Sequence, residues 1–202
     1  MTSIEHVTIE VTDPTDHFHT DAFNLGDRLR VRGSHEPTEG FRGFTLSLTV
    51  SQPGDVDALV ETAVNAGATP VKPAAKSLWG YGAVVQAPDG TIWKLATSAK
   101  KNTGPATGKI NDVVLLLGVA DVLASKKFYV EQGLTVTKSF ARMYVEFATG
   151  PVKLALYKRK ALAKDAGVSP EGTGSHRITV GGTKAFTDPD GFTWEPAMAP
   201  LS

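Results

Sequence analysis

The sequence predicts an α+β fold built from two related halves. Three observations indicate this: a Pro-Asp-Gly turn followed by tryptophan occurs twice, a first strand occurs twice at nearly the same spacing, and amphipathic helices separate segments rich in β-branched residues. Of the 202 residues, 41% are hydrophobic and 21% are charged, which is close to the average for globular domains. We therefore expect a packed core and no long disordered segment.

The repeated turn is the clearest sign of duplication. Residues 86–94, Gln-Ala-Pro-Asp-Gly-Thr-Ile-Trp-Lys, resemble residues 187–195, Thr-Asp-Pro-Asp-Gly-Phe-Thr-Trp-Glu. Pro and Gly around Asp form a tight turn in which Gly supplies the positive φ. One such turn is common, but two with tryptophan at the same offset favour duplication. On a strand, Trp93 and Trp194 face away from the charged residue that follows each, so we expect both in the core.

The first strand is repeated as well. Residues 4–11 resemble residues 110–117, and both segments are rich in β-branched and aliphatic residues, as strands are. His6 and Asp112 are 106 positions apart, and the residues after the two tryptophans are 101 apart. The polar segment 98–108 reads as a linker. The sequence therefore predicts a first half, 1–97, and a second half, 109–202.

The remaining elements follow from periodicity and from helix termini. Asp55 is a plausible N-cap for a helix that Gly67 ends, and Gly133 ends another. His17 and His19 flank Phe18 in a weak, short helix, where we expect them on the surface. The predicted helices are 17–25, 55–66 and 121–132, with a helical turn at 161–167. The predicted later strands are 142–148, 152–157 and 176–180.

Charge, cysteine content and apolar runs restrict the partners. The 21 basic residues balance the 21 acidic ones, so the net charge gives no reason to expect nucleic acid. The chain has no cysteine, which excludes disulfides, thiolate metal sites and a cysteine nucleophile. No signal peptide is recognisable, and the longest apolar run, 113–117, is far shorter than the roughly 20 residues that span a bilayer. We expect a cytoplasmic protein with a small-molecule ligand and no membrane partner.

A family resemblance appears at the strand–helix segments. Residues 119–136, with Phe128-Tyr129 and Gly133-Leu134, resemble the opening of a vicinal oxygen chelate module, the unit of glyoxalases, bleomycin-resistance proteins and extradiol dioxygenases. Residues 55–68, followed by Trp79-Gly80-Tyr81 and the Pro-Asp-Gly hairpin, resemble a second module. The resemblance implies tandem βαβββ modules that form half-open mixed sheets around a pocket. By the spacing of their matching positions, the first half has a shortened opening module and the second half a truncated closing module.

The same resemblance implies where a metal would bind. Catalytic members use His or Gln on the first strand, Glu on the fourth, His on the fifth and Glu on the eighth. In the first half His6 matches the first position, but the fifth falls near Thr45 and the eighth is Lys94. We therefore expect that half to be metal-free.

The second half matches the ligand pattern better. Asp112 stands at its first position, Tyr157 near the fourth, His176 at the fifth and Glu195 at the eighth. Asp112, His176 and Glu195 are the predicted ligands of one divalent metal, Zn, Ni, Fe or Mn, which suit such ligands. The alternative is no metal at all, with a strand-end Asp, an exposed His and a surface Glu.

Four aromatic residues are candidate ligand-binding residues. Trp79 and Tyr81 lie in the loop that often closes the pocket in this family, and Tyr144 and Tyr157 are candidates for the second pocket. An aromatic-lined cleft suits a flat or hydrophobic small molecule.

Three functions fit these residues, and catalytic activity is an open question. The first is a metal-dependent lyase or isomerase of the glyoxalase kind, in which Glu195 moves the proton. The second is metal-free binding or sequestration of a small molecule, as in resistance proteins. An iron-dependent extradiol dioxygenase fits less well, because Asp112 is a poor match. The truncated modules either form a homodimer or pair within one chain.

Overall fold

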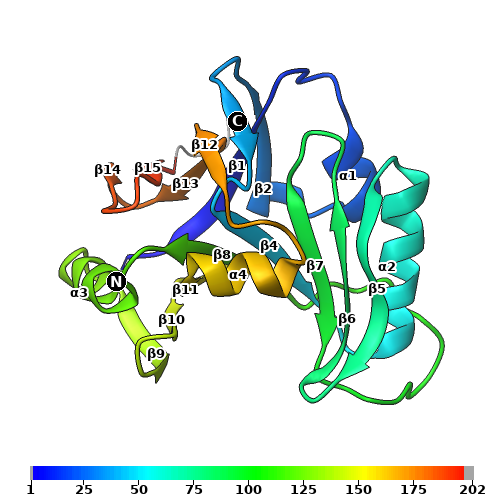
Figure 1. Ribbon diagram of the computed structural model, residues 1–202. Coiled ribbons are helices and arrows are strands. Elements are labelled where there is room, and N and C mark those ends of the chain that lie inside the picture. Colours follow the sequence, from blue (N-terminus) through cyan, green and yellow to red (C-terminus); the bar gives the residue numbers. More distant parts are fainter. Residues whose placement is uncertain (1, 198–202) are drawn as a thin grey trace.

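The computed structural model describes residues 2–197; residue 1, where the predicted first half begins, and residues 198–202, where the predicted second half ends, lie outside the described part. The chain forms two mixed sheets and one small ribbon (Figure 1). The elements are β1 (Ile4–Val11), α1 (Phe18–Phe23), η1 (Gly26–Arg28), β2 (Leu29–Gly33), β3 (Thr38–Gly40), β4 (Phe44–Thr49), α2 (Pro53–Asn65), β5 (Thr69–Ser77), β6 (Gly80–Gln86), β7 (Ile92–Thr97), β8 (Asp112–Val119), α3 (Val122–Glu131), β9 (Thr135–Phe140), β10 (Tyr144–Ala148), β11 (Val152–Lys158), α4 (Arg159–Ala166), β12 (Gly172–Gly174), β13 (Ile178–Gly182), β14 (Phe186–Thr187) and β15 (Thr193–Pro196).

The larger sheet, here the central sheet, consists of two complete βαβββ modules. Its strand order is β5-β6-β7-β4-β8-β11-β10-β9. In each module the first strand runs parallel to the last, β4 beside β7 and β8 beside β11, and the two first strands pair antiparallel. The sheet does not close on itself. This confirms the predicted fold class, tandem βαβββ modules in half-open mixed sheets.

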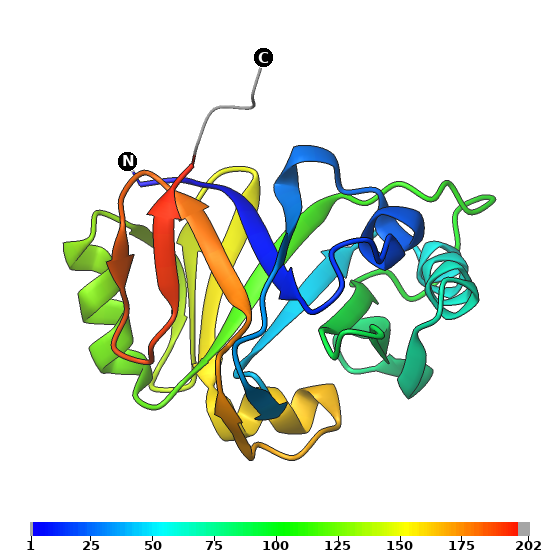
Figure 2. The same cartoon turned by 90° about the horizontal axis from the view of Figure 1, so that it is seen from above.

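The smaller sheet, here the terminal sheet, joins the two ends of the chain. Its order is β14-β15-β13-β1-β2, with β1 antiparallel to β13 and parallel to β2. Seen from above, the blue strand β1 lies beside the orange strand β13, and the red strand β15 lies on the other side of β13 (Figure 2). Each sheet therefore takes strands from both predicted halves. The two ends pair within one chain, the pseudo-dimer arrangement that the sequence left open, and homodimerisation stays a prediction.

The local signals in the sequence explain most of the elements. Asp121 is the N-cap of α3, where its side chain accepts hydrogen bonds from the backbone N–H groups of Leu123 and Ala124. Gly90 and Gly191 have φ of 90° and 89° in the two turns, as predicted. The prediction of Asp55 as an N-cap is wrong: α2 begins at Pro53, and the Asp55 carboxylate accepts the backbone N–H of Thr107 at 2.6 Å. The segment 98–108 is thus held against α2.

One main core lies between the two sheets and the helices α1, α2 and α3. Trp93 and Trp194 are fully buried in it, which confirms the prediction for both. Because side chains alternate along a strand, Lys94 and Leu116 lie on the opposite face of the central sheet, here called the open face. Helix α4 covers part of the open face, and its Leu162 forms a second, smaller apolar cluster with Val84 and Leu116 (Figure 1). Within residues 2–197 no helix is long and apolar enough to cross a membrane.

Candidate site on the open face of the central sheet

Four neighbouring strands of the central sheet each carry one of the positions that correspond to metal ligands in the family. The strands β7, β4, β8 and β11 lie in this order, and they present Lys94, Thr45, Asp112 and Tyr157. Of these four residue types, aspartate alone is a common ligand for a divalent cation. The carboxylate of Asp112 is occupied, since it contacts the ammonium of Lys153 at 2.9 Å and accepts the Thr49 hydroxyl at 3.1 Å.

Lys94 forms an ion pair with a residue of α4. The Lys94 Nζ lies 2.6 Å from Oδ2 of Asp165. A second lysine, Lys72, donates to the backbone carbonyls of Lys164 and Asp165 at 3.1 and 2.6 Å. A lysine at a helix C-terminus satisfies carbonyl groups that lack a partner and interacts favourably with the helix dipole. Two lysines of the sheet thus hold the C-terminal end of α4 against the open face.

The terminal sheet brings His6 and Glu195 onto one face. His6 of β1 pairs in register with Gly181 of β13, and Gly181 pairs with Glu195 of β15. Burial, and then the charge of Arg30, lowers the pKa of His6. Glu195 is bound by Arg32, whose guanidinium lies 3.2 Å from this carboxylate.

Arg32 joins two carboxylates on this face. It also contacts Oε1 of Glu10 at 2.7 Å, and the hydrogen bond to Glu10 raises the pKa of Arg32. A protein cation thus occupies the carboxylates of the terminal sheet, just as Lys153 occupies Asp112 in the central sheet. The residues at the family's ligand positions do not fit a divalent metal in either sheet, because Asp112 is the one common ligand among them in the central sheet and His6 and Glu195 are the two in the terminal sheet, fewer than the three or four side chains that such a site uses.

The three predicted metal ligands do not come together in this structure. Asp112 lies in the central sheet and Glu195 in the terminal sheet. His176 precedes β13, and its ring is stacked on Phe192 at 4.0 Å between centroids. Its two nitrogens face the backbone carbonyls of residues 42 and 190, at 2.7 and 3.0 Å, so neither is available to a metal. Over residues 2–197 no group of three or more His, Asp or Glu side chains is arranged to hold a metal ion.

The three residues lie apart because of how the halves pair. Grouping Asp112 with Glu195 assumed that strands of one half share a sheet. Instead β8 pairs with β4 of the first half, and β15 lies in the sheet that contains β1. The sequence repeat located the equivalent positions but did not indicate which strands are neighbours.

The predicted aromatic ligand residues fall into separate places. Trp79 lies at the tip of the β5–β6 hairpin with 83% of its surface exposed, and it borders a cavity of about 320 Å³. Tyr81 borders the same cavity, but its side chain lies on the helix-covered face, where its hydroxyl donates to Asp57 of α2 at 2.7 Å. Tyr144 and Tyr157 lie in the other module, with ring centroids 5.8 Å apart. Of these four residues, Trp79 and Tyr81 border the cavity, and Trp79 is the more exposed of the two.

The cavity on the open face has a regular arrangement. Along the strands, the register places Ser77 beside Gly80 near Trp79, then Ala75, Gly82 and Ala96 in one row, and then Lys72, Val84 and Lys94 in the next. The middle row has no side-chain atom beyond Cβ. The cavity therefore has a flat floor, an aromatic side chain at one end, and Lys72, Lys94 and Asp165 at the other.

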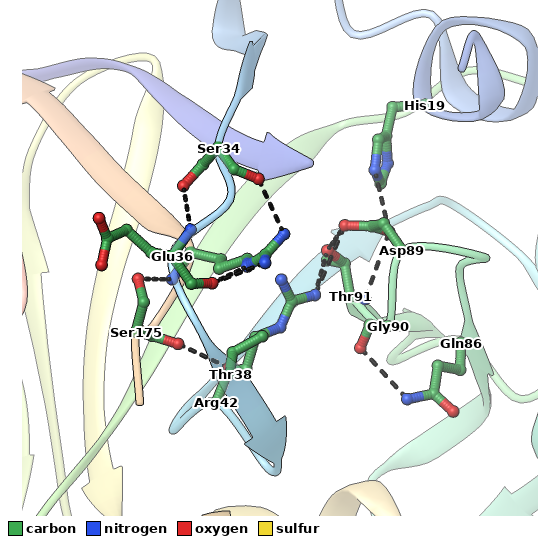
Figure 3. Close-up of polar contacts among 11 residues, drawn as sticks. His19, Ser34, Glu36, Thr38, Arg42, Gln86, Asp89, Gly90, Thr91 and Ser175 are labelled. Atoms are coloured by element: carbon green, nitrogen blue, oxygen red, sulfur yellow. Dashed lines mark hydrogen bonds and ion pairs between the residues drawn. The ribbon is translucent and has the colours of Figure 1, made fainter. Parts of the chain in front are cut away.

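A second polar cluster lies at the first Pro-Asp-Gly turn (Figure 3). Nη2 of Arg42 donates to the Thr91 hydroxyl at 2.8 Å and lies 3.5 Å from Oδ2 of Asp89, while Nε2 of His19 lies 3.3 Å from Oδ1. Burial alone would raise the pKa of Asp89, but the contacts with His19, Thr91 and Arg42 outweigh it and lower the pKa to about 2.

This cluster has a structural role. Asp89 and His19 are both buried, so the expectation that His19 lies on the surface is wrong. The cluster borders a cavity of about 400 Å³ between the turn and the segments 38–42 and 168–171. Its charged side chains contact one another, and they join the turn to α1 and to the start of β4.

Asp165 and Arg32, which bind the charged residues of the two sheets, were not among the residues predicted from the sequence. Asp165 lies in the segment 161–167, which was expected to form only a helical turn. The spacing carried a signal, because residues 112–176 span more of the chain than the matching residues 6–45. The additional length forms the strands β9 and β10 as well as α4. The sequence around Arg32 did not indicate its role, because neighbouring residues do not show which carboxylates a surface arginine contacts in the folded chain.

No protein-family model and no curated protein matches this chain. Solved structures do match it. Glyoxalase I from Zea mays aligns with 96% of this chain and 91% of its own length, at a TM-score of 0.61 and 14% identity. A proposed dioxygenase from Bacillus subtilis aligns with 88% of this chain and 69% of its own length, at a TM-score of 0.54 and 10% identity. At such low identity the similarity establishes the fold alone.

Proposed function

We propose that this chain, which has the fold of the vicinal oxygen chelate proteins, is a binding protein for a planar small molecule and that this binding requires no metal ion. The single observation that carries the proposal is the cavity of about 320 Å³ on the open face, with the exposed Trp79 at one end and lysines at the other. Its volume falls at the lower end of the range of small-molecule sites.

The floor of the cavity suits a flat ligand. Ala75, Gly82 and Ala96 form one row across three strands, so an aromatic ring can approach the sheet closely over an area without protruding side chains. Trp79 is 83% exposed, although tryptophan stabilises proteins mainly through burial of its large apolar surface. An exposed tryptophan on the rim of the cavity is explained if the aromatic ring of a bound ligand stacks against it.

The charged side chains favour metal-free binding over the metal-dependent lyase. Lys94 stands where the family pattern has a glutamate, and its charge is directed at the open face. Glu195, the residue that would move the proton in a lyase, is held by Arg32 in the other sheet. In a lyase of this family, a carboxylate would stand in place of Lys94, or Glu195 would be free of Arg32 to move a proton.

A titration followed by NMR tests the proposed function. The chain has three tryptophans, so its ¹⁵N spectrum contains three indole N–H resonances, and two of these tryptophans are fully buried. We expect added 2-naphthoate to shift the Trp79 resonance and to leave those of Trp93 and Trp194 nearly unchanged. The dissociation constant should be the same in the presence of EDTA.

Two adjacent residues provide the matched variants. Trp79→Ala should weaken naphthoate binding by about tenfold or more, since an aromatic pair contributes roughly 1 kcal/mol beyond the area it buries. Leu78→Ala should bind like the wild type, because Leu78 is equally exposed but does not border the cavity. Loss of binding on chelation, or equal binding by the two variants, would contradict the proposed function.

A further inference from the structure

We propose that the natural ligand of this cavity carries a carboxylate, and that Asp165 of α4 occupies the place of that carboxylate at Lys94 in the free protein. The inference rests on the proposed function of the cavity. It adds the charge of the ligand and a competitor that belongs to the chain itself.

The charge balance of the cavity points to an anion. Among the described residues that border it, three are lysines, Lys72, Lys76 and Lys94, and one is acidic, Asp165. The ammonium of Lys72 donates to two backbone carbonyls. These partners carry no net charge, so they leave the positive charge of Lys72 uncompensated. These four residues carry a net charge of +2, and a ligand carboxylate beside Lys94 and Lys72 would reduce this excess to +1. A neutral ligand would leave the excess unchanged, and a cationic ligand would increase it.

The geometry of the ion pair makes Asp165 a stand-in. Its Oδ2 lies 2.6 Å from the ammonium of Lys94, slightly closer than the roughly 2.7–2.9 Å of a charge-assisted hydrogen bond between an ammonium and a carboxylate. Lys94 belongs to the row of residues that ends the flat floor, next to Gly82 and Ala96. A planar carboxylate whose ring lies on that floor would place its charged group where the Asp165 carboxylate now lies.

Asp165 can leave without disturbing the fold. The side chains of Lys94 and Asp165 are 34% and 45% exposed, and exposed ion pairs contribute only about 0–1 kcal/mol. The neighbouring Leu162, Ala163 and Ala166 hold α4 against the sheet through buried apolar contacts. The Asp165 side chain can therefore rotate into solvent while the helix stays in place.

The position of Asp165 in α4 also requires an explanation beyond helix stability. It is the residue before Ala166, which ends α4, and a negative charge near a helix C-terminus interacts unfavourably with the helix dipole. Asp165 offsets this disadvantage through Lys94. A ligand carboxylate at Lys94 would take the place of the Asp165 carboxylate. Binding would therefore exchange one ion pair of Lys94 for another, at a small net cost in free energy.

The experiment compares a charged and an uncharged ligand of the same shape. Isothermal titration calorimetry measures the binding of 2-naphthoate and of 2-naphthamide to wild type, Asp165→Asn, Lys94→Gln and Lys94→Arg. We expect Asp165→Asn to bind naphthoate about three- to fivefold more tightly, within the range for removal of an exposed ion pair. Lys94→Gln should bind it less tightly by a similar factor, and Lys94→Arg should retain binding. Naphthamide affinity should change little in any variant.

The outcomes separate the inference from the proposed function. Naphthoate affinity that is unchanged or reduced in Asp165→Asn, or naphthoate and naphthamide responding alike to Lys94→Gln, would overturn the inference, while binding of both compounds to wild type would leave the proposed function standing. Absence of binding of either compound to wild type and to Asp165→Asn would overturn both. Far-ultraviolet circular dichroism and thermal unfolding verify that each variant is folded.

Discussion

Asp89 and Asp190 occupy the same position in the two Pro-Asp-Gly turns, and each joins its turn to a helix of the other sheet. Asp89, in the turn between two strands of the central sheet, lies 3.3 Å from His19 of α1, which connects strands of the terminal sheet. Asp190, in a turn of the terminal sheet, accepts the N–H of Ala120 at 2.8 Å and the hydroxyl of Ser125 in α3 at 3.1 Å. The two turns therefore fasten the two sheets to each other.

The first prediction concerns the buried ion pair at Asp89. Asp89→Asn removes the negative charge beside Arg42, whose side chain is 5% exposed. Because a buried charge without a counter-charge is costly, the free energy of unfolding should fall by about 3 kcal/mol, as measured by urea denaturation. The exposed Glu61→Gln in α2 is the control and should change stability by less than about 0.5 kcal/mol. Equal stability of the two variants would contradict this role of Asp89.

The second prediction follows from the low pKa of the same group. The folded state lowers the pKa of Asp89 from 3.8 to about 2. Its contribution to stability is therefore complete above pH 4 and is lost as the pH falls through 3.8 towards 2. The difference corresponds to roughly 2 kcal/mol. Denaturation between pH 5 and pH 2 should show a steeper loss of stability for wild type than for Asp89→Asn, and parallel curves would refute the assignment.

The third prediction concerns the contact of β1 with β13. A Cβ added at Gly181 would overlap the imidazole of His6, which is 2% exposed. Gly181→Ala should lower the free energy of unfolding by about 1–3 kcal/mol, as overpacking does. Gly104→Ala is the matched control, since no atom lies within 4 Å of its added Cβ.

A double variant tests whether the two residues are coupled. In the background His6→Ala, the imidazole is absent, so Gly181→Ala should cost much less than in the wild type. A double-mutant cycle measures this coupling. Additive effects of the two substitutions would show that His6 does not lie against Gly181.

The sequence was sufficient to predict features that depend on neighbouring residues. The paired turns with Gly90 and Gly191 and the buried Trp93 follow from spacing over a few positions, and the structure confirms them. The N-cap at Asp55 was wrong because its carboxylate has a tertiary partner, the backbone of Thr107, that no local pattern indicates.

Features that depend on strand pairing were beyond the sequence. The repeat places Asp112 and Glu195 in the same predicted half. The strands of the two halves pair with each other, however, and this pairing places the two residues in different sheets. Lys94 and Asp165 form an ion pair although they are 71 positions apart in the chain. Asp165 belongs to α4, which lies outside the repeated segments of the sequence. The repeat identified which positions correspond, and only the tertiary arrangement shows which side chains meet.

The most direct test of the account is a crystal structure of the protein with 2-naphthoate, grown in the presence of EDTA. We expect electron density for the naphthyl ring over Gly82 and Ala96, against Trp79, with the carboxylate at Lys94 and the Asp165 side chain turned away. Naphthoate density elsewhere with an empty cavity, or a cavity in which Asp165 stays on Lys94 beside the bound ring, would contradict it.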